Sequence, residues 1–144
     1  MENIFLVVTE SRETAKVLDF GIAKFLPIAT LQITVDTAPG AVLGTLRYMS
    51  PEQWRGQEAH PAWDLWALAV VTYEMLAGAY PFDGRSPADW FGVGPVARFT
   101  PVATHLPEAP QSWQGLFERT FASEPTRRPQ SAETLLSELQ SALS

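Results

Sequence analysis

Three observations predict that this chain has a mostly helical α+β fold. Two short apolar runs near the N-terminus, residues 4–8 and 15–18, flank a polar stretch and are typical of a β-hairpin. After residue 50, helix-start motifs and apolar residues at helical spacing dominate. The chain has 144 residues, of which 46% are hydrophobic and 18% charged, which is enough for one domain with a buried core.

A long loop is predicted between the hairpin and the helices. Residues 25–44 show no helical periodicity and include Pro27 and Pro39. A loop of about twenty residues in a compact domain is usually functional or mobile. It ends before Ser50-Pro51-Glu52-Gln53, which combines an N-cap serine, a proline at the first helical position and a glutamine at the capping-box position. We therefore expect a helix to begin at residue 51.

Further helices are predicted beyond residue 60. Residues 63–77 are apolar on nearly all sides, which is typical of a helix at the centre of a domain, and Gly78 is a natural stop. Residues 81–110 contain six prolines and should be irregular, with one short helix near residues 88–91. Apolar residues at i, i+3 and i+4 predict two amphipathic helices, at residues 111–122 and 131–143.

Composition excludes several classes of function. The net charge of −6 and the absence of a basic cluster argue against a nucleic-acid partner or an anionic membrane surface. Without cysteine there is no disulfide, thiolate zinc site or cysteine nucleophile. The most apolar stretch, residues 62–77, contains Asp64 and Glu74 and is too short to span a bilayer. With no targeting segment visible, we expect a cytoplasmic location and no membrane span.

Four motifs follow one another in a fixed order. They are "KVLDFGIAK" (16–24), "GTLRYMSPE" (44–52), "DLWALAVVTYEMLAG" (64–78) and "EPTRRP" (124–129). Together they resemble the C-terminal lobe of the protein kinase family, in particular the bacterial Ser/Thr kinases of eukaryotic type, over nearly the whole chain. The resemblance implies a partial kinase domain over residues 1–144 without an N-lobe, divided into the end of the catalytic loop, a hairpin carrying the DFG motif, an activation segment (19–52) and a helical C-lobe (53–144).

The resemblance also implies roles for residues near the hairpin. The DFG aspartate of the family holds Mg²⁺ against the phosphates of ATP, and Asp19 matches it. Phe20 would pack into the core, and Gly21 would permit the turn of the backbone. Asn3 would be the second magnesium ligand. Thr45 matches the threonine near the catalytic base and favours Ser/Thr over Tyr as the acceptor. Taken alone, Asp19 is an ordinary turn aspartate and Asn3 a solvated polar residue.

Other positions match structural residues of the family. Glu52 and Arg128 resemble a buried ion pair that attaches the end of the activation segment to the helical core, and Asp64 resembles an aspartate that binds the catalytic-loop backbone. Taken alone, Glu52 is a first-turn glutamate and Arg128 a surface arginine. The long loop also holds candidate phosphosites, which are equally well explained as solvated loop residues: Thr34, Thr37 and, less favoured, Thr30.

Parts of the kinase machinery have no match in these residues. His60 and His105 are followed by proline and leucine, so neither belongs to an HRD motif with its catalytic aspartate. Residues 92–97 fit G-x-G-x-x-A but follow no clear strand and open no helix. The two lysines, Lys16 and Lys24, both flank the DFG motif. The family uses ATP and Mg²⁺, but we expect this chain alone to be catalytically inactive and to bind neither appreciably.

Two hypotheses remain for the role of the chain. It is either a fragment of a Ser/Thr kinase, whose partners would be a protein substrate and an N-lobe-bearing polypeptide, or a stand-alone C-lobe remnant that binds proteins without catalysis. The second hypothesis is expected to leave Trp66, Leu68 and Val70 partly bare, because helices that cover them in the family are missing. An unrelated helical domain would need Glu52 and Arg128 to lie far apart.

Overall fold

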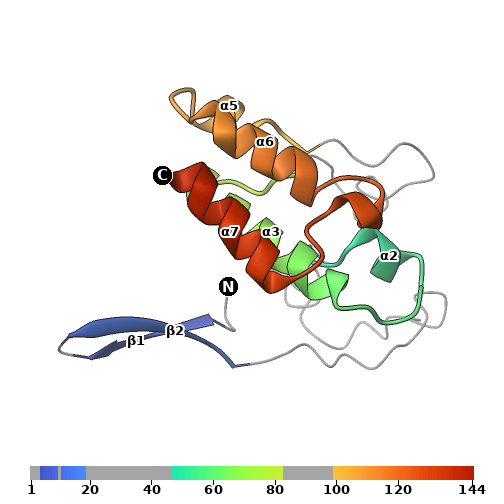
Figure 1. Ribbon diagram of the computed structural model, residues 1–144, viewed down its shortest axis with the longest axis horizontal. Coiled ribbons are helices and arrows are strands. Elements are labelled where there is room, and N and C mark those ends of the chain that lie inside the picture. Colours follow the sequence, from blue (N-terminus) through green and yellow to red (C-terminus); the bar gives the residue numbers. More distant parts are fainter. Residues whose placement is uncertain (1–3, 10, 19–46, 83–98) are drawn as a thin grey trace, which may run out of the picture. The chain divides into compact units, whose positions relative to one another are not determined.

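The computed structural model describes residues 4–9, 11–18, 47–82 and 99–144 (Figure 1). The chain divides into two units, residues 1–32 with the hairpin and residues 33–144 with the helices, and each is described by itself. The described residues form one antiparallel strand pair and a larger set of helices. The predicted α+β class, mostly helical with one hairpin, is therefore confirmed.

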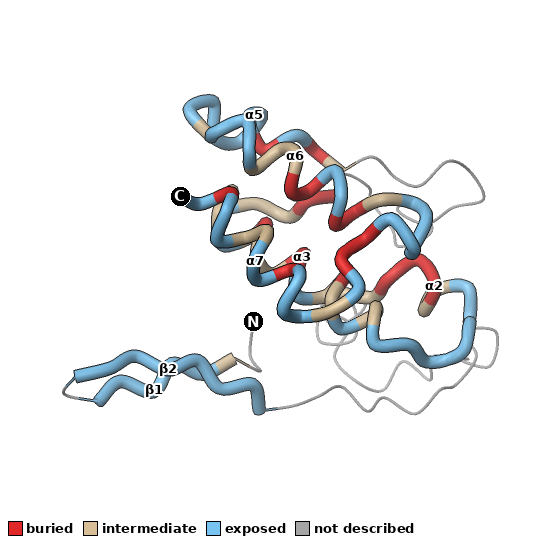
Figure 2. Tube along the Cα trace, viewed as in Figure 1, coloured by how far each residue is buried: buried red, intermediate tan, exposed pale blue. Residues whose placement is uncertain are grey.

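The hairpin consists of β1 (Ile4–Thr9) and β2 (Arg12–Val17). Its register pairs Ile4 with Val17 and Thr9 with Arg12, and the Thr9 hydroxyl donates to the Arg12 carbonyl over 3.0 Å. β2 begins three residues earlier than the apolar run that predicted it, because the register pairs the last residues of β1 with polar partners, among them Val8 with Glu13. Every residue of the two strands except Ile4, which is half-buried, is exposed (Figure 2).

The first described helix, α2 (Pro51–Trp54), begins as the sequence predicts. The Gln53 amide donates to the Ser50 hydroxyl over 3.3 Å, and the Ser50 amide donates to the Gln53 side-chain oxygen over 2.8 Å. This reciprocal pair is a capping box, and it satisfies two backbone donors that the helix itself leaves unpaired.

The central helix is α3 (Ala62–Ala77), one residue longer at its start than predicted. It ends at Gly78, which adopts φ 67° and donates its amide to the Glu74 carbonyl over 3.0 Å. A left-handed residue at this position strongly favours glycine. The buried positions of α3 recur at helical spacing and are Trp66, Ala69, Val70 and Tyr73.

Four further elements lie among the described residues of the helical unit: α5 (Val102–His105), α6 (Gln111–Thr120), the 3₁₀ helix η2 (Pro125–Arg127) and α7 (Ala132–Leu143). α6 ends two residues earlier than predicted. α7 begins directly after its N-cap residue, Ser131, whose hydroxyl accepts a hydrogen bond from the Thr134 amide over 3.1 Å. The sequence pattern does not predict α5 and η2, because elements of four and three residues are too short to show an apolar period. The predicted loop at 25–44 and helix at 88–91 lie outside the described residues.

An aromatic core joins these helices. α6 packs against both α3 and α7 (Figure 1). The Trp66 ring stacks on Phe82 with 5.4 Å between centroids, and Tyr73 meets Phe117 edge to face at 4.9 Å. Such aromatic contacts add to the stabilisation that comes from burial alone.

The expected baring of the central helix is only partly observed. Trp66 and Val70 are 1% and 0% exposed, so that expectation was wrong for both, because residues from α6 and from the segment around Phe82 cover them. Leu68, by contrast, is 44% exposed. None of the helices in the described part of the chain is long and apolar enough to cross a bilayer.

Candidate functional site

The described residues contain the structural part of the proposed site. Glu52, Asp64 and Arg128 are described, on α2, on α3 and directly after η2. The residues for which the sequence implies magnesium binding, a place near the base or phosphorylation lie outside the described residues: Asn3, Asp19, Phe20, Gly21, Thr30, Thr34, Thr37 and Thr45.

Glu52 and Arg128 lie 76 positions apart in the sequence and form a two-pronged ion pair. Arg128 Nη1 donates to Glu52 Oε2 and Nη2 donates to Glu52 Oε1, each over 2.9 Å. The side chains of Arg128 and Glu52 are only 3% and 8% exposed. Parallel N–H···O bonds between a guanidinium and a carboxylate are among the strongest polar contacts in proteins. The pair therefore joins α2 to the segment just before α7.

Further contacts hold the Arg128 guanidinium in place. Its Nε donates to the Ala122 carbonyl over 2.8 Å, and the guanidinium lies over the Trp66 ring, 4.7 Å from the centroid. One guanidinium thus connects α2, the central helix and the chain after α6. Its N–H groups donate to a carboxylate and to backbone carbonyls, and the plane of the guanidinium lies over an aromatic ring. The hydrogen-bonding groups and the charge of this buried side chain therefore have partners.

The electrostatics of the pair favour an ionised Glu52. Burial by itself would raise the pKa of the Glu52 carboxyl, but the hydrogen bonds and the positive charge of Arg128 outweigh that effect. The net result is a pKa below the ordinary value of 4.5 for glutamate. The pair is therefore a structural contact that stays charged at neutral pH.

Asp64 lies in the first turn of α3 and is exposed. A carboxylate in the first turn is stabilised by the partial positive charge of the helix N-terminus. That position supplies a sufficient structural reason for an aspartate. Its implied contact with a catalytic-loop backbone remains a prediction.

A second polar cluster, which the sequence pattern does not predict, joins residues 47–48 to the C-terminal part of α3 and to Tyr80 just beyond it. Tyr48 Oη donates to Glu74 Oε2 over 2.8 Å, and Tyr80 Oη donates to the Arg47 carbonyl. The Arg47 guanidinium lies 4.1 Å from the centroid of the Tyr80 ring. These contacts span 26 and 33 positions, so no local spacing indicates them.

Burial and neighbouring charges keep the two tyrosines of this cluster protonated. Burial first, and then the hydrogen bond and negative charge of Glu74, raise the pKa of Tyr48 to about 12. Burial also raises the pKa of Tyr80, and the positive charge of Arg47 only partly opposes it. Both hydroxyls therefore remain hydrogen-bond donors at neutral pH.

Across residues 4–9, 11–18, 47–82 and 99–144, no three side chains among His, Asp and Glu are grouped so that they could hold a metal ion. The oxygen donors implied for Mg²⁺, a carboxylate at Asp19 and an amide at Asn3, have the hard-ligand chemistry that this ion prefers. They are not among the described residues.

Comparison with known proteins first defines the fold. The chain resembles the solved structure of the Cydia pomonella granulovirus kinase PK-1 with a TM-score of 0.62 and 20% sequence identity, over 96% of this chain and 47% of that one. At this level of identity the likeness establishes a kinase-like fold alone.

The family follows from the sequence comparisons. The protein kinase domain model matches residues 1–139, so the chain belongs to the protein kinase family. It is 36% identical to the serine/threonine-protein kinase PrkC of Bacillus subtilis over 128 residues, which cover 88% of this chain and 19% of that protein. It is 35% identical to the serine/threonine-protein kinase pkn2 of Myxococcus xanthus over 145 residues, 98% of this chain and 17% of that protein. The chain thus spans less than a fifth of either relative.

Proposed function

We propose that this chain supplies the C-terminal lobe of a bacterial-type Ser/Thr protein kinase domain, whose reaction is phosphoryl transfer from ATP to a serine or threonine of a protein substrate. The observation that carries the proposal is the buried Glu52–Arg128 pair, which joins two motifs 76 positions apart. In this proposal the activation segment covers residues 19–52 and the helical lobe residues 53–144. A cytoplasmic location belongs to the proposal because ATP is the phosphoryl donor.

The residues before the helical unit carry the chemistry in this proposal. Mg²⁺, when held there, neutralises charge on the phosphates of ATP. Asp19 and Asn3 would bind it through oxygen atoms, with Phe20 and Gly21 setting the position of Asp19. Thr45 would lie beside the catalytic base and favour a serine or threonine acceptor. The carboxylate of Asp64 would accept hydrogen bonds from the backbone of the catalytic loop and so orient that loop.

We further propose that residues 1–144 by themselves do not catalyse phosphoryl transfer. Catalysis of this reaction depends almost wholly on positioning and electrostatic stabilisation, and the sequence carries no HRD aspartate and no matching lysine strand. An N-lobe-bearing polypeptide would have to supply these groups. Translating the DNA upstream of Met1 in every frame tests whether such a polypeptide is encoded there. An HRD motif in one of these frames would support the proposal.

Isothermal titration calorimetry with Mg²⁺ and ATP tests the inactivity of the purified chain directly. The wild-type chain and Asp19→Ala should both give no binding heat. Micromolar ATP binding that Asp19→Ala abolishes would overturn the proposal and make the chain a self-sufficient nucleotide-binding module. A phosphotransfer assay on a generic basic protein, run on the same two proteins, should give no incorporation above background.

A second candidate function is a stand-alone protein-binding lobe without catalysis. The observation in its favour is that the helical unit buries its own aromatic core, with Trp66, Tyr73 and Phe117 at most 1% exposed. Size-exclusion chromatography and a thermal melt of the chain distinguish the candidates. A sharp monomer peak with a cooperative melt favours the stand-alone lobe, whereas soluble aggregates without a transition favour a dependent fragment.

The candidate phosphosites depend on the same proposal. Thr34 and Thr37, and with less support Thr30, would be modified in the activation segment of a complete kinase. A phosphate orders a loop only when a cationic side chain pairs with it. The arginine of the HRD motif would be that partner, so we expect no such switch in residues 1–144 alone.

A further inference from the structure

The central helix α3 begins with a histidine that has no role in the proposed reaction. Pro61 already has helical backbone angles, φ −54° and ψ −24°, and a proline has no amide hydrogen to donate. The first amides of the helix are therefore those of Ala62 and Trp63. Ala62 N donates to His60 Nδ1 over 3.2 Å, and Trp63 N donates to the His60 carbonyl over 3.0 Å. His60 thus acts as the N-terminal cap of α3, followed by a proline in the place that suits proline best.

A histidine caps a helix through its side chain only in the neutral form. The common capping residues, Ser, Thr, Asp and Asn, keep an acceptor oxygen at neutral and mildly acidic pH. The Nδ1 atom of imidazole accepts a hydrogen bond only while it carries no proton, and both ring nitrogens are donors in the protonated form. Protonation of His60 would also place a positive charge beside the partial positive charge of the helix N-terminus. Histidine changes its charge between about pH 5 and 8, so mild acid should open this cap.

Two acidic side chains near His60 in the sequence act in the opposite direction. Glu58 precedes it by two residues, Asp64 follows it by four, and both are exposed. They would attract a protonated ring, but solvent screens the interaction between exposed charges. One exposed attraction is weaker on average than one side-chain cap. The net effect of protonating His60 should therefore be destabilising.

The charged groups of the elements packed behind the start of α3 do not change this balance. Ala62 borders a small cavity together with Arg128 and with Leu135 of α7. The charge of Arg128 is paired with the Glu52 carboxylate. The charged residue in the first turn of α7, Glu133, is exposed, so solvent screens it as well.

We propose that His60 is a pH-sensitive cap that positions the first turn of α3, residues 62–65. The cap is closed while the imidazole is neutral, and it opens as the pH falls through the titration range of the ring. The same turn carries Asp64, so where the proposed function also holds, His60 positions the residue that orients the catalytic loop. Only this last consequence rests on the proposed function.

Urea unfolding of the full chain at pH 7.5 and pH 5.5 tests the cap. His60→Asn is the conservative variant, because its amide oxygen can accept from the Ala62 amide at both pH values. Acidification should raise the equilibrium constant for unfolding of the wild type about fivefold more than that of His60→Asn, which is the effect of losing one ordinary cap. His60→Ala lacks the cap at either pH, so at pH 7.5 its constant should exceed that of the wild type by about the same factor.

Nuclear magnetic resonance of the same proteins tests whether the effect is local. In the wild type, the amide signals of Ala62 and Trp63 should move together with the ring signals of His60 as the pH falls. The second histidine supplies the matched control, since His105 lies in the last turn of α5 and meets the Tyr73 ring edge to face at 6.4 Å. A positive charge is favourable at that end of a helix. The variant His105→Asn should therefore keep the wild-type pH response at the start of α3.

Three results would overturn the proposal. The first is an equal response of the wild type and His60→Asn to acid. The second is a wild type that acid stabilises relative to His60→Asn, which would mean that the protonated ring pairs with an acidic neighbour such as Asp64. The third is an Ala62 amide signal that does not follow the titration of the His60 ring. If His60→Asn does not fold, the titration of the wild type and of His105→Asn decides the question. These measurements use no ATP, so failure of the cap and failure of the proposed function are separate results.

Discussion

Replacing Arg128 by methionine tests the energetic role of the buried ion pair. Methionine retains much of the apolar stem but removes the guanidinium, which leaves the buried Glu52 carboxylate without its two 2.9 Å hydrogen bonds. Removing one partner of a buried pair typically costs about 3–5 kcal/mol, because the remaining charge is stranded. The lost contacts to the Ala122 carbonyl and the Trp66 ring add to this cost. Since whole domains are stable by only about 5–15 kcal/mol, the change should remove a large share of the stability.

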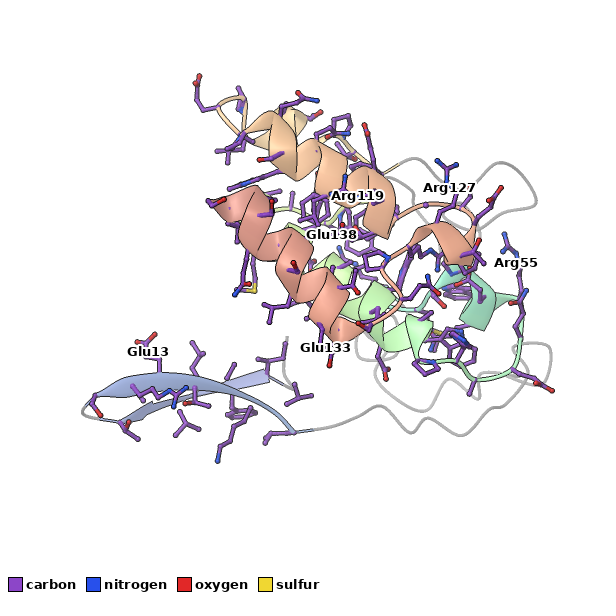
Figure 3. The ribbon with its side chains drawn as sticks, viewed as in Figure 1. Glu13, Arg55, Arg119, Arg127, Glu133 and Glu138 are labelled. Carbon is purple, nitrogen blue, oxygen red and sulfur yellow. The ribbon has the colours of Figure 1, made fainter. Side chains whose placement is uncertain are left out.

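The pair between Arg119 of α6 and Glu138 of α7 is the matched control. Arg119 Nε and Glu138 Oε2 are also 2.9 Å apart, and the two side chains point toward one another (Figure 3). Their exposed fractions, however, are 54% and 27%, so solvent screens the interaction. An exposed pair is worth about 0–1 kcal/mol. The change Arg119→Met should therefore cost at least about 2 kcal/mol less than Arg128→Met.

Urea unfolding at neutral pH, followed by tryptophan fluorescence, measures both costs. A double-mutant cycle with Glu52→Gln and Arg128→Met should show strong coupling, because the double variant strands no charge and loses less than the sum of the single changes. A strongly stabilising buried pair is contradicted if Arg128→Met costs no more than Arg119→Met, or if the costs of Glu52→Gln and Arg128→Met are additive. If Arg128→Met does not fold, Glu52→Gln alone, which preserves the shape of the side chain, gives the comparison.

Three smaller predictions follow from the same structure. Because the pKa of Glu52 is lowered by folding, its stabilising effect is complete above the ordinary glutamate value of 4.5 and is lost as the pH falls through the folded value. Urea midpoints between pH 7 and pH 3 should consequently fall less steeply in Glu52→Gln, and an equal slope would contradict this. Ser131→Ala removes the N-cap of α7 and should lower the free energy of unfolding by about 0.5–2 kcal/mol in urea titrations, with no loss pointing to a replacement cap. Gly78→Ala places a Cβ at φ 67°, where nothing lies within 4 Å, so its cost should be backbone strain alone. That strain is about 1–2 kcal/mol, and thermal melts should show the same loss for Gly56→Ala at φ 66°.

Local features of the fold were predictable because their causes are local. The Ser50 capping box, the Gly78 stop and the cap of α7 each depend on a few neighbouring residues with definite hydrogen-bonding or backbone preferences. The hairpin follows from two short runs on either side of a polar turn. α5 and η2 escaped notice because elements of four and three residues carry no apolar period, and they are set by the prolines and the tertiary contacts around them.

The long-range contacts divide into those that a family pattern implies and those that nothing in the sequence implies. The Glu52–Arg128 pairing was implied by motif order, since no spacing rule links residues 76 apart. The hydrogen bond between Tyr48 and Glu74 had no such pattern to point to it, because these residues lie 26 positions apart and meet only when the helices pack. Polar tertiary contacts of this kind depend on the relative placement of whole elements, which local preferences do not fix.

The burial pattern of α3 shows which of its side chains stabilise the helical unit. Trp66 and Val70 lie on the face that the helical unit covers, while Leu68 and Met75 lie two turns apart on one side of the helix and are 44% and 72% exposed. The core of the unit thus closes without those two side chains. The buried aromatic and aliphatic side chains of this core stabilise the unit because they are removed from water, whereas Leu68 and Met75 remain largely in contact with water and contribute little.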